Sequence, residues 1–202
     1  MKIAQEKHNP KWEADALSNI GNAYNFLEDY QQGKNYCQQA LNMAREIGDY
    51  DNAIYFYKKS LIIIAKNSID YDNELTALES LGNIYNVIKD YVNAKKYYQQ
   101  YLELAKELDL LQEQSWGLND IGNIFYNSRE YVEALKYYQQ SQLIYQKIKN
   151  FEFRLIVLKN IGNTYYAMAD YSYALEYYQQ SLALAQQLGN RSMEALVLGY
   201  LG

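Results

Sequence analysis

The chain has 202 residues, of which 49% are hydrophobic and 21% charged, and its formal net charge is -5. The acidic balance provides no basic stripe that could contact phosphates, so we expect no nucleic-acid partner. No apolar run reaches the roughly 20 residues that a membrane-spanning helix needs, and the first residues lack the apolar core of a secretion signal. We therefore expect a cytoplasmic protein with no membrane partner.

Residues that commonly carry chemistry are scarce. Cys37 is the single cysteine and His8 the single histidine. One cysteine cannot form an internal disulfide, and Cys37 falls where a later copy of the same pattern has a tyrosine, which favours a packing role. His8 has no partner at metal-ligand spacing. Because no phosphate-binding glycine loop or nucleophile motif occurs either, we expect no enzymatic activity, no metal and no cofactor.

The first predicted helix runs over residues 10–27, with Asn9 as its N-cap and Pro10 as its first residue. Small residues then recur at helical spacing over residues 31–47 and again over residues 51–66. Both stretches have the pattern of the second helix of a hairpin, and no first helix separates them. Two outcomes are possible here. Either the chain bends at Gly48, or residues 31–66 form one long helix that leaves apolar surface open and requires a dimer. Gly48 followed by Asp49 is typical of a helix end and a helix start, which favours the bend.

From residue 73 onwards one pattern repeats with a period of about 40 residues, marked by the glycines at 82, 122 and 162. Each copy holds an amphipathic helix, a turn containing Asp-Tyr or Glu-Tyr, and a second amphipathic helix. A mid-helix glycine costs about 1 kcal/mol relative to alanine, so its recurrence indicates a close approach that a side chain would block. Stacked helical hairpins of this period form an α-solenoid.

The repeat boundaries follow from this period. We expect an all-α, right-handed superhelical solenoid of antiparallel helix pairs, with an irregular half-repeat near residues 48–66. The expected units cover residues 10–47, 51–66 (half unit), 73–108, 113–149, 152–188 and 191–202. Residues 2–14 align with residues 183–195, so we also expect the chain to be a fragment cut inside repeats at both ends.

The sequence resembles the tetratricopeptide repeat. The resemblance rests on Leu/Ile-Gly, an aromatic residue three positions after the glycine, Asp-Tyr, Ala and Tyr-Tyr, as in Ile161-Gly162, Tyr165, Asp170-Tyr171, Ala174 and Tyr177-Tyr178. The Gly-Asn pairs and the 40-residue period resemble the longer subclass found in G-protein-signalling modulator adaptors, kinesin light chains and bacterial peptide-sensing regulators. Lys89, Arg129 and Ala169 stand where a turn glycine is common. The resemblance implies a groove, lined by first helices, that binds extended peptides.

On each first helix, one face beside the apolar stripe carries three residues spaced by four and three positions. These candidate peptide-binding residues are Ser18, Asn22 and Asn25; Glu79, Asn83 and Asn86; Asn119, Asn123 and Tyr126; and Lys159, Asn163 and Tyr166.

A carboxamide both donates and accepts hydrogen bonds, so Asn22, Asn83, Asn123 and Asn163 could pair with an extended backbone. The same asparagines could instead bond a neighbouring repeat, and the sequence leaves this structural interpretation open. Lys159 is the only basic residue of the set, which argues against a clamp for a C-terminal carboxylate and favours a neutral or mildly basic segment.

Two functions remain possible at this point. The first is a protein-binding scaffold that holds an extended segment of a partner, or of another domain of its own parent chain, in an asparagine-lined groove. The second is a self-assembly module, which would give a homodimer or larger oligomer through open solenoid ends or the irregular repeat.

Overall fold

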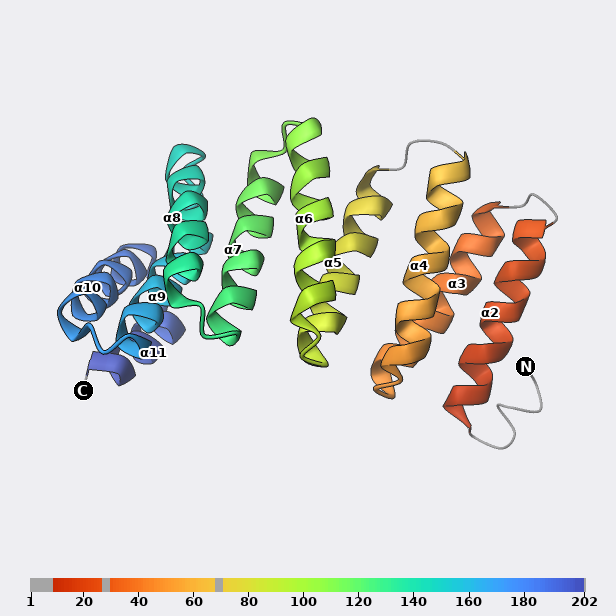
Figure 1. Ribbon diagram of the computed structural model, residues 1–202, viewed down its shortest axis with the longest axis horizontal. Coiled ribbons are helices and arrows are strands. Elements are labelled where there is room, and N and C mark those ends of the chain that lie inside the picture. Colours follow the sequence, from red (N-terminus) through yellow and green to blue (C-terminus); the bar gives the residue numbers. More distant parts are fainter. Residues whose placement is uncertain (1–8, 27–29, 68–70, 202) are drawn as a thin grey trace. The chain divides into compact units, whose positions relative to one another are not determined.

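The structure is a computed structural model that describes residues 9–26, 30–67 and 71–201 (Figure 1). Within these ranges it contains ten helices and no strand. The helices are α2 (Pro10–Phe26), α3 (Tyr30–Glu46), α4 (Tyr50–Asn67), α5 (Tyr71–Val87), α6 (Tyr91–Glu107), α7 (Leu111–Asn127), α8 (Tyr131–Lys147), α9 (Phe151–Ala167), α10 (Tyr171–Leu188) and α11 (Arg191–Leu201). The all-α solenoid class predicted from the sequence is confirmed.

The chain forms two compact units, Met1–Ile88 and Lys89–Gly202, and each is described by itself. Unit 1 holds α2 to α5, and unit 2 holds α6 to α11. Among the described helices, none combines the length and the apolar character that a bilayer span requires.

In unit 2, helices α6 to α10 have 17 or 18 residues each, α11 has 11, and turns of two or three residues separate them. Lys149 shows how such a turn is made, with φ of 56° and a backbone bond of 3.0 Å from Asn150 N–H to the Tyr145 carbonyl. This left-handed residue satisfies the last carbonyls of the helix and reverses the chain. The other positions with positive φ in this unit are Lys89, Asp109, Arg129, Ala169 and Gly189. Non-glycine residues therefore adopt the turn conformation that glycine usually supplies.

Helices α7 and α8 cross at Ser115 and Ser141, which both have small side chains. The Ser115 hydroxyl donates to the Ser141 carbonyl at 2.7 Å, and the Ser141 hydroxyl donates to the Ser115 carbonyl at 2.8 Å. One repeat later, the Ser181 hydroxyl donates to the Leu155 carbonyl of α9 at 3.3 Å. Because these hydroxyls are buried and satisfied, the helices can approach closely without leaving polar groups unpaired.

The mid-helix glycines make room for tyrosine rings of the following helix. A Cβ added at Gly162 would lie 2.7 Å from two ring carbons of Tyr178, and one at Gly122 would lie at the same distance from two ring carbons of Tyr138. The close approach predicted from the glycine period is confirmed at both positions.

In unit 1, residues 31–66 form two helices and not one. α3 ends at Glu46 and α4 begins at Tyr50, and Gly48 has φ of 69° between them. The bent form expected from Gly48 is confirmed, and the single long helix is excluded. The Asp49 side chain caps α4 by accepting from the Asn52 N–H at 3.3 Å.

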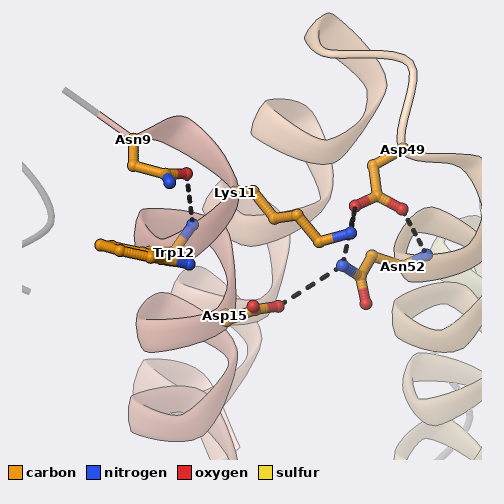
Figure 2. Close-up of polar contacts among 6 residues, drawn as sticks. All are labelled: Asn9, Lys11, Trp12, Asp15, Asp49 and Asn52. Carbon is orange, nitrogen blue, oxygen red and sulfur yellow. Dashed lines mark hydrogen bonds and ion pairs between the residues drawn. The ribbon is translucent and has the colours of Figure 1, made fainter.

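Although α4 has the sequence pattern of a second helix, it lies beside α2 as a first helix would (Figure 2). Lys11 of α2 forms an ion pair with Asp49 at 2.9 Å, and the Asn52 amide donates to the Asp15 carboxylate at 3.4 Å. In unit 2 the same kind of bond joins successive first helices. There the Asn150 amide at the start of α9 donates to Gln112 of α7 at 3.2 Å. The short turn forces α4 to reverse direction after α3. This reversal places α4 where a first helix would lie, although its sequence pattern is that of a second helix.

Candidate functional site

The candidate site in unit 2 is the face of α7 and α9 that carries the asparagines, and we call it the amide face. It comprises Asn119, Asn123 and Tyr126 on α7, with Lys159, Asn163 and Tyr166 on α9. The spacing of four and three positions places each group of three along one side of its helix. The two helices are neighbours, because the Asn160 amide of α9 donates to Asn119 Oδ1 of α7 at 3.1 Å.

Each central asparagine is held by a tyrosine of the next helix. The Tyr138 hydroxyl donates to Asn123 Oδ1 at 2.7 Å, and the Tyr178 hydroxyl donates to Asn163 Oδ1 at 2.8 Å. The rings of the same two tyrosines pack on the mid-helix glycines, Tyr138 on Gly122 and Tyr178 on Gly162. The Gly-Asn pair and the tyrosine that bonds its asparagine therefore act as one structural element.

Burial stabilises the protonated form of these tyrosines. It raises the pKa of Tyr178 to about 12, and it also raises the pKa of Tyr138 well above its usual value. Both hydroxyls thus remain donors at any ordinary pH. Each asparagine oxygen already accepts one hydrogen bond from its tyrosine, and this bond fixes the direction in which the amide nitrogen can donate.

Asp120 and Asn160 join the amide face in a way that the sequence pattern did not reveal. Asp120 accepts from the amides of Asn119 and Asn123, both at 3.3 Å. Asn160 lies within 3.5 Å of Asn123 Oδ1 as well as bonding Asn119. The only signal in the sequence was that Asp120 and Asn160 each stand directly before an Ile-Gly-Asn motif.

The structure places the individual candidate residues at different depths. Ser18 and Asn119 are buried, with 5% and 8% exposure, so they offer little area to a ligand. Asn123, Asn163 and Lys159 are half-buried. Tyr126 is half-buried as well, whereas Tyr166 is exposed.

The remaining candidates belong to unit 1. On α5, Glu79 and Asn86 are half-buried and Asn83 is exposed. Burial raises the pKa of Glu79, and Arg45 of α3 partly offsets that rise. The side chains of Asn22 and Asn25 lie outside the described residues.

His8 and the Cys37 side chain also lie outside the described part of the chain, so the structure gives no account of them. In the part that is described, no three histidine, cysteine, aspartate or glutamate side chains come together as a metal site would require.

Comparisons with known proteins identify the scaffold. The tetratricopeptide repeat family profile matches residues 42–107 and 113–187, and a second tetratricopeptide repeat profile matches residues 14–47. The chain belongs to the tetratricopeptide repeat family. Members of this family are generally scaffolds for protein–protein interaction that lack enzymatic activity. A comparison with curated proteins found no match.

Solved structures show the same fold at low sequence identity. BtubC (BKLC) from P. vanneervenii is similar with a TM-score of 0.72 and 18% identity, over 89% of this chain and 74% of that one. A putative kinesin light chain of Podosopora anserina with TPR-like repeats has a TM-score of 0.72 and 13% identity, over 94% and 92% of the two chains. Aspartyl phosphate phosphatase F from Bacillus subtilis has a TM-score of 0.71 and 12% identity, over 97% of this chain and 57% of that one. At these identities the likeness concerns the fold alone.

Proposed function

We propose that this tetratricopeptide repeat chain binds an extended peptide or protein segment along the asparagine-bearing faces of its first helices. The candidate contacts are Asn22 and Asn83 within unit 1, and Asn123 and Asn163 within unit 2. Support comes from the hydrogen bond of 2.8 Å between the Tyr178 hydroxyl and Asn163 Oδ1. That bond fixes the amide before any ligand arrives, so ordering the side chain adds little entropic cost to binding.

An extended backbone suits such fixed amides. It presents carbonyl oxygens at regular spacing, and an asparagine nitrogen can donate to one of them whatever the adjoining side chain is. Each bond of this kind contributes about 1 kcal/mol net, so the affinity also requires side-chain contacts from the segment. The segment belongs to another protein or to another domain of the same parent chain.

The test starts from a peptide selected against the whole chain from a displayed library of random sequences. The affinity of the selected peptide is measured for the native chain and for Asn163→Ala by fluorescence anisotropy. We expect weaker binding by Asn163→Ala, together with a loss of about 1 kcal/mol in stability because the Tyr178 hydroxyl loses its acceptor, so the affinity is measured well below the melting temperature. Asn42→Ala is the control, because Asn42 is an exposed residue of α3 that bonds only Gln38 among the described residues.

Unchanged affinity in Asn163→Ala would refute a role for the asparagine in binding. A lowered melting temperature with unchanged affinity would assign Asn163 to the structure of the repeat instead.

Self-assembly is the second candidate, and one observation favours it. Tyr173 and Leu175 of α10 are 51% and 46% exposed, and Leu196 and Leu198 of α11 are 42% and 52% exposed. Exposed apolar side chains on two adjoining helices can contribute to a contact between copies. Light scattering at several concentrations tests this, because assembly requires a mass that rises with concentration.

A further inference from the structure

The α7 and α9 parts of the amide face differ in how many of their hydrogen-bonding groups are already used. On α7, the Asn119 amide donates to Asp120 and its oxygen accepts from Asn160. Asn123 donates to Asp120, and its oxygen accepts from Tyr138. Both asparagines of α7 thus belong to a network that joins α7 to α8 and α9.

Asn163 on α9 is in a different situation. Its oxygen accepts from Tyr178, but its amide nitrogen makes no hydrogen bond within the described ranges of the chain. Tyr166, three positions further on, is 59% exposed. The same helix face therefore presents an unused amide donor next to an accessible phenol.

Lys159 lies one turn before Asn163 and is half-buried. Its ammonium forms no ion pair with any residue that the structure describes, and burial lowers its pKa with no contribution from a neighbouring charge. A cation withdrawn from water without a counter-charge is destabilising. An anionic group arriving at this place would supply the missing partner.

Helix α11 lies beside the Asn163 part of this face. Tyr200 of α11 stacks on Tyr178 at 5.2 Å between ring centroids, which brings α11 next to the Asn163 bond. Beside Tyr200 is Gly199, which falls one repeat period after Lys159, and a Cβ added there would meet no atom within 4 Å. The equivalent position thus carries a half-buried lysine on α9 and no side chain on α11.

We propose that Lys159, Asn163 and Tyr166 bind an anionic side chain of the extended segment, either a carboxylate or a phosphorylated hydroxyl. All three present donors, namely an ammonium, an amide N–H and a phenol O–H, and hydrogen bonds from such groups to an anionic oxygen are the strong ones. On α7, Asn119 and Asn123 already donate to Asp120, so they are not part of this anionic site. This inference rests on the proposed function, and it replaces the neutral or mildly basic segment that the sequence favoured.

The probes are three capped pentapeptides, four glycines with a central glutamate, phosphoserine or glutamine, each added at millimolar concentration to the whole 15N-labelled chain. Binding is followed by the amide chemical shifts of α9. We expect the glutamate or phosphoserine peptide to bind about tenfold more tightly than the glutamine peptide, which is about 1.4 kcal/mol. The tighter of the two anionic peptides identifies the source of the charge.

Lys159→Met should remove the preference for the anionic peptides. The matched control is Lys147→Met, which removes one positive charge from an exposed position in the last turn of α8 and should leave the preference intact.

Each other outcome has a distinct meaning. Equal binding of all three peptides would overturn the anionic site while leaving the proposed groove function in place. No shift at α9 with any of the three would overturn the anionic site, whereas the groove function is tested separately by the selected peptide and Asn163→Ala. A preference that persists in Lys159→Met would place the charge recognition elsewhere and refute the site.

Discussion

The ring of Tyr138 occupies the space that a side chain at position 122 would need, with two ring carbons 2.7 Å from an ideal Cβ on Gly122. Tyr178 and Gly162 have the same relationship one repeat later. We expect Gly162→Ala to destabilise the chain by about 1–3 kcal/mol, because overpacking outweighs the gain of about 1 kcal/mol in helix propensity. Thermal melting followed by circular dichroism measures the effect.

Gly199→Ala is the control for this prediction. A Cβ at Gly199 has open space, so only the propensity gain applies and the melting temperature should stay the same or rise. Equal effects at positions 162 and 199 would contradict the role of the tyrosine ring.

Tyr178→Phe tests the hydrogen bond separately from the ring. The ring still packs on Gly162, but Asn163 Oδ1 loses the donor that lies 2.8 Å away. We expect a loss of about 1 kcal/mol in the free energy of unfolding, measured by urea denaturation. A stability equal to that of the native chain would mean that water replaces the hydroxyl without cost.

Asp49 should make stability depend on pH at the acidic end. Its bond to Lys11, and further bonds to Asn52, lower the pKa of Asp49 below its usual value. A lowered carboxylate pKa stabilises the fold fully above the usual value near 4, and this contribution is lost as the pH falls through the lowered pKa. We expect Asp49→Asn to melt below the native chain at pH 6 and to converge with it as the pH falls below about 4.

Because asparagine also caps helices well, Asp49→Asn keeps the cap of α4 while it removes the charge and the Oδ2 acceptor of Lys11 and of the Asn52 amide. Lys11 is largely exposed, so the difference should be small and should shrink in high salt. Melting curves that stay apart at low pH would show that the charge is not the cause.

Ala169→Gly should stabilise the turn between α9 and α10. Ala169 has φ of 61°, a left-handed conformation that costs an L-residue about 1–2 kcal/mol. Glycine relieves this cost but adds about 0.5–1 kcal/mol of chain entropy, so we expect a net gain of about 0.5–1 kcal/mol. The reverse change, Gly189→Ala at φ of 66°, should cost about 1 kcal/mol in the same denaturation assay. A loss of stability in Ala169→Gly would contradict this account.

The α3–α4 junction shows where the sequence was sufficient and where it was not. Gly48 followed by Asp49 predicted a helix end and a helix start, and both lie there, because a left-handed residue and a cap are local requirements. The motif of α4 was that of a second helix, yet α4 lies beside α2, because its position depends on chain reversal and on bonds to residues far back in the chain.

For the candidate site, too, the sequence was sufficient to predict one part and not the other. The regular repeat period located Asn123 and Asn163, and it placed them on one kind of helix face. It treated them as equivalent, however, and their different hydrogen-bonding partners became visible only with α8, α9 and α10 in place. The role of these asparagines in binding, and the division of the chain into repeat units, stay predictions.

The sequence by itself determined the helices, their turns and the repeat family, because helical periodicity, caps and mid-helix glycines act over a few residues or recur at a fixed interval. Only the tertiary structure decided that Asp120 and Asn160 join the asparagines of α7 and that Lys159 is half-buried without a counter-charge. The physical reason is that hydrogen-bond partners and desolvation depend on which helices lie side by side. That arrangement depends on contacts between residues far apart in the chain.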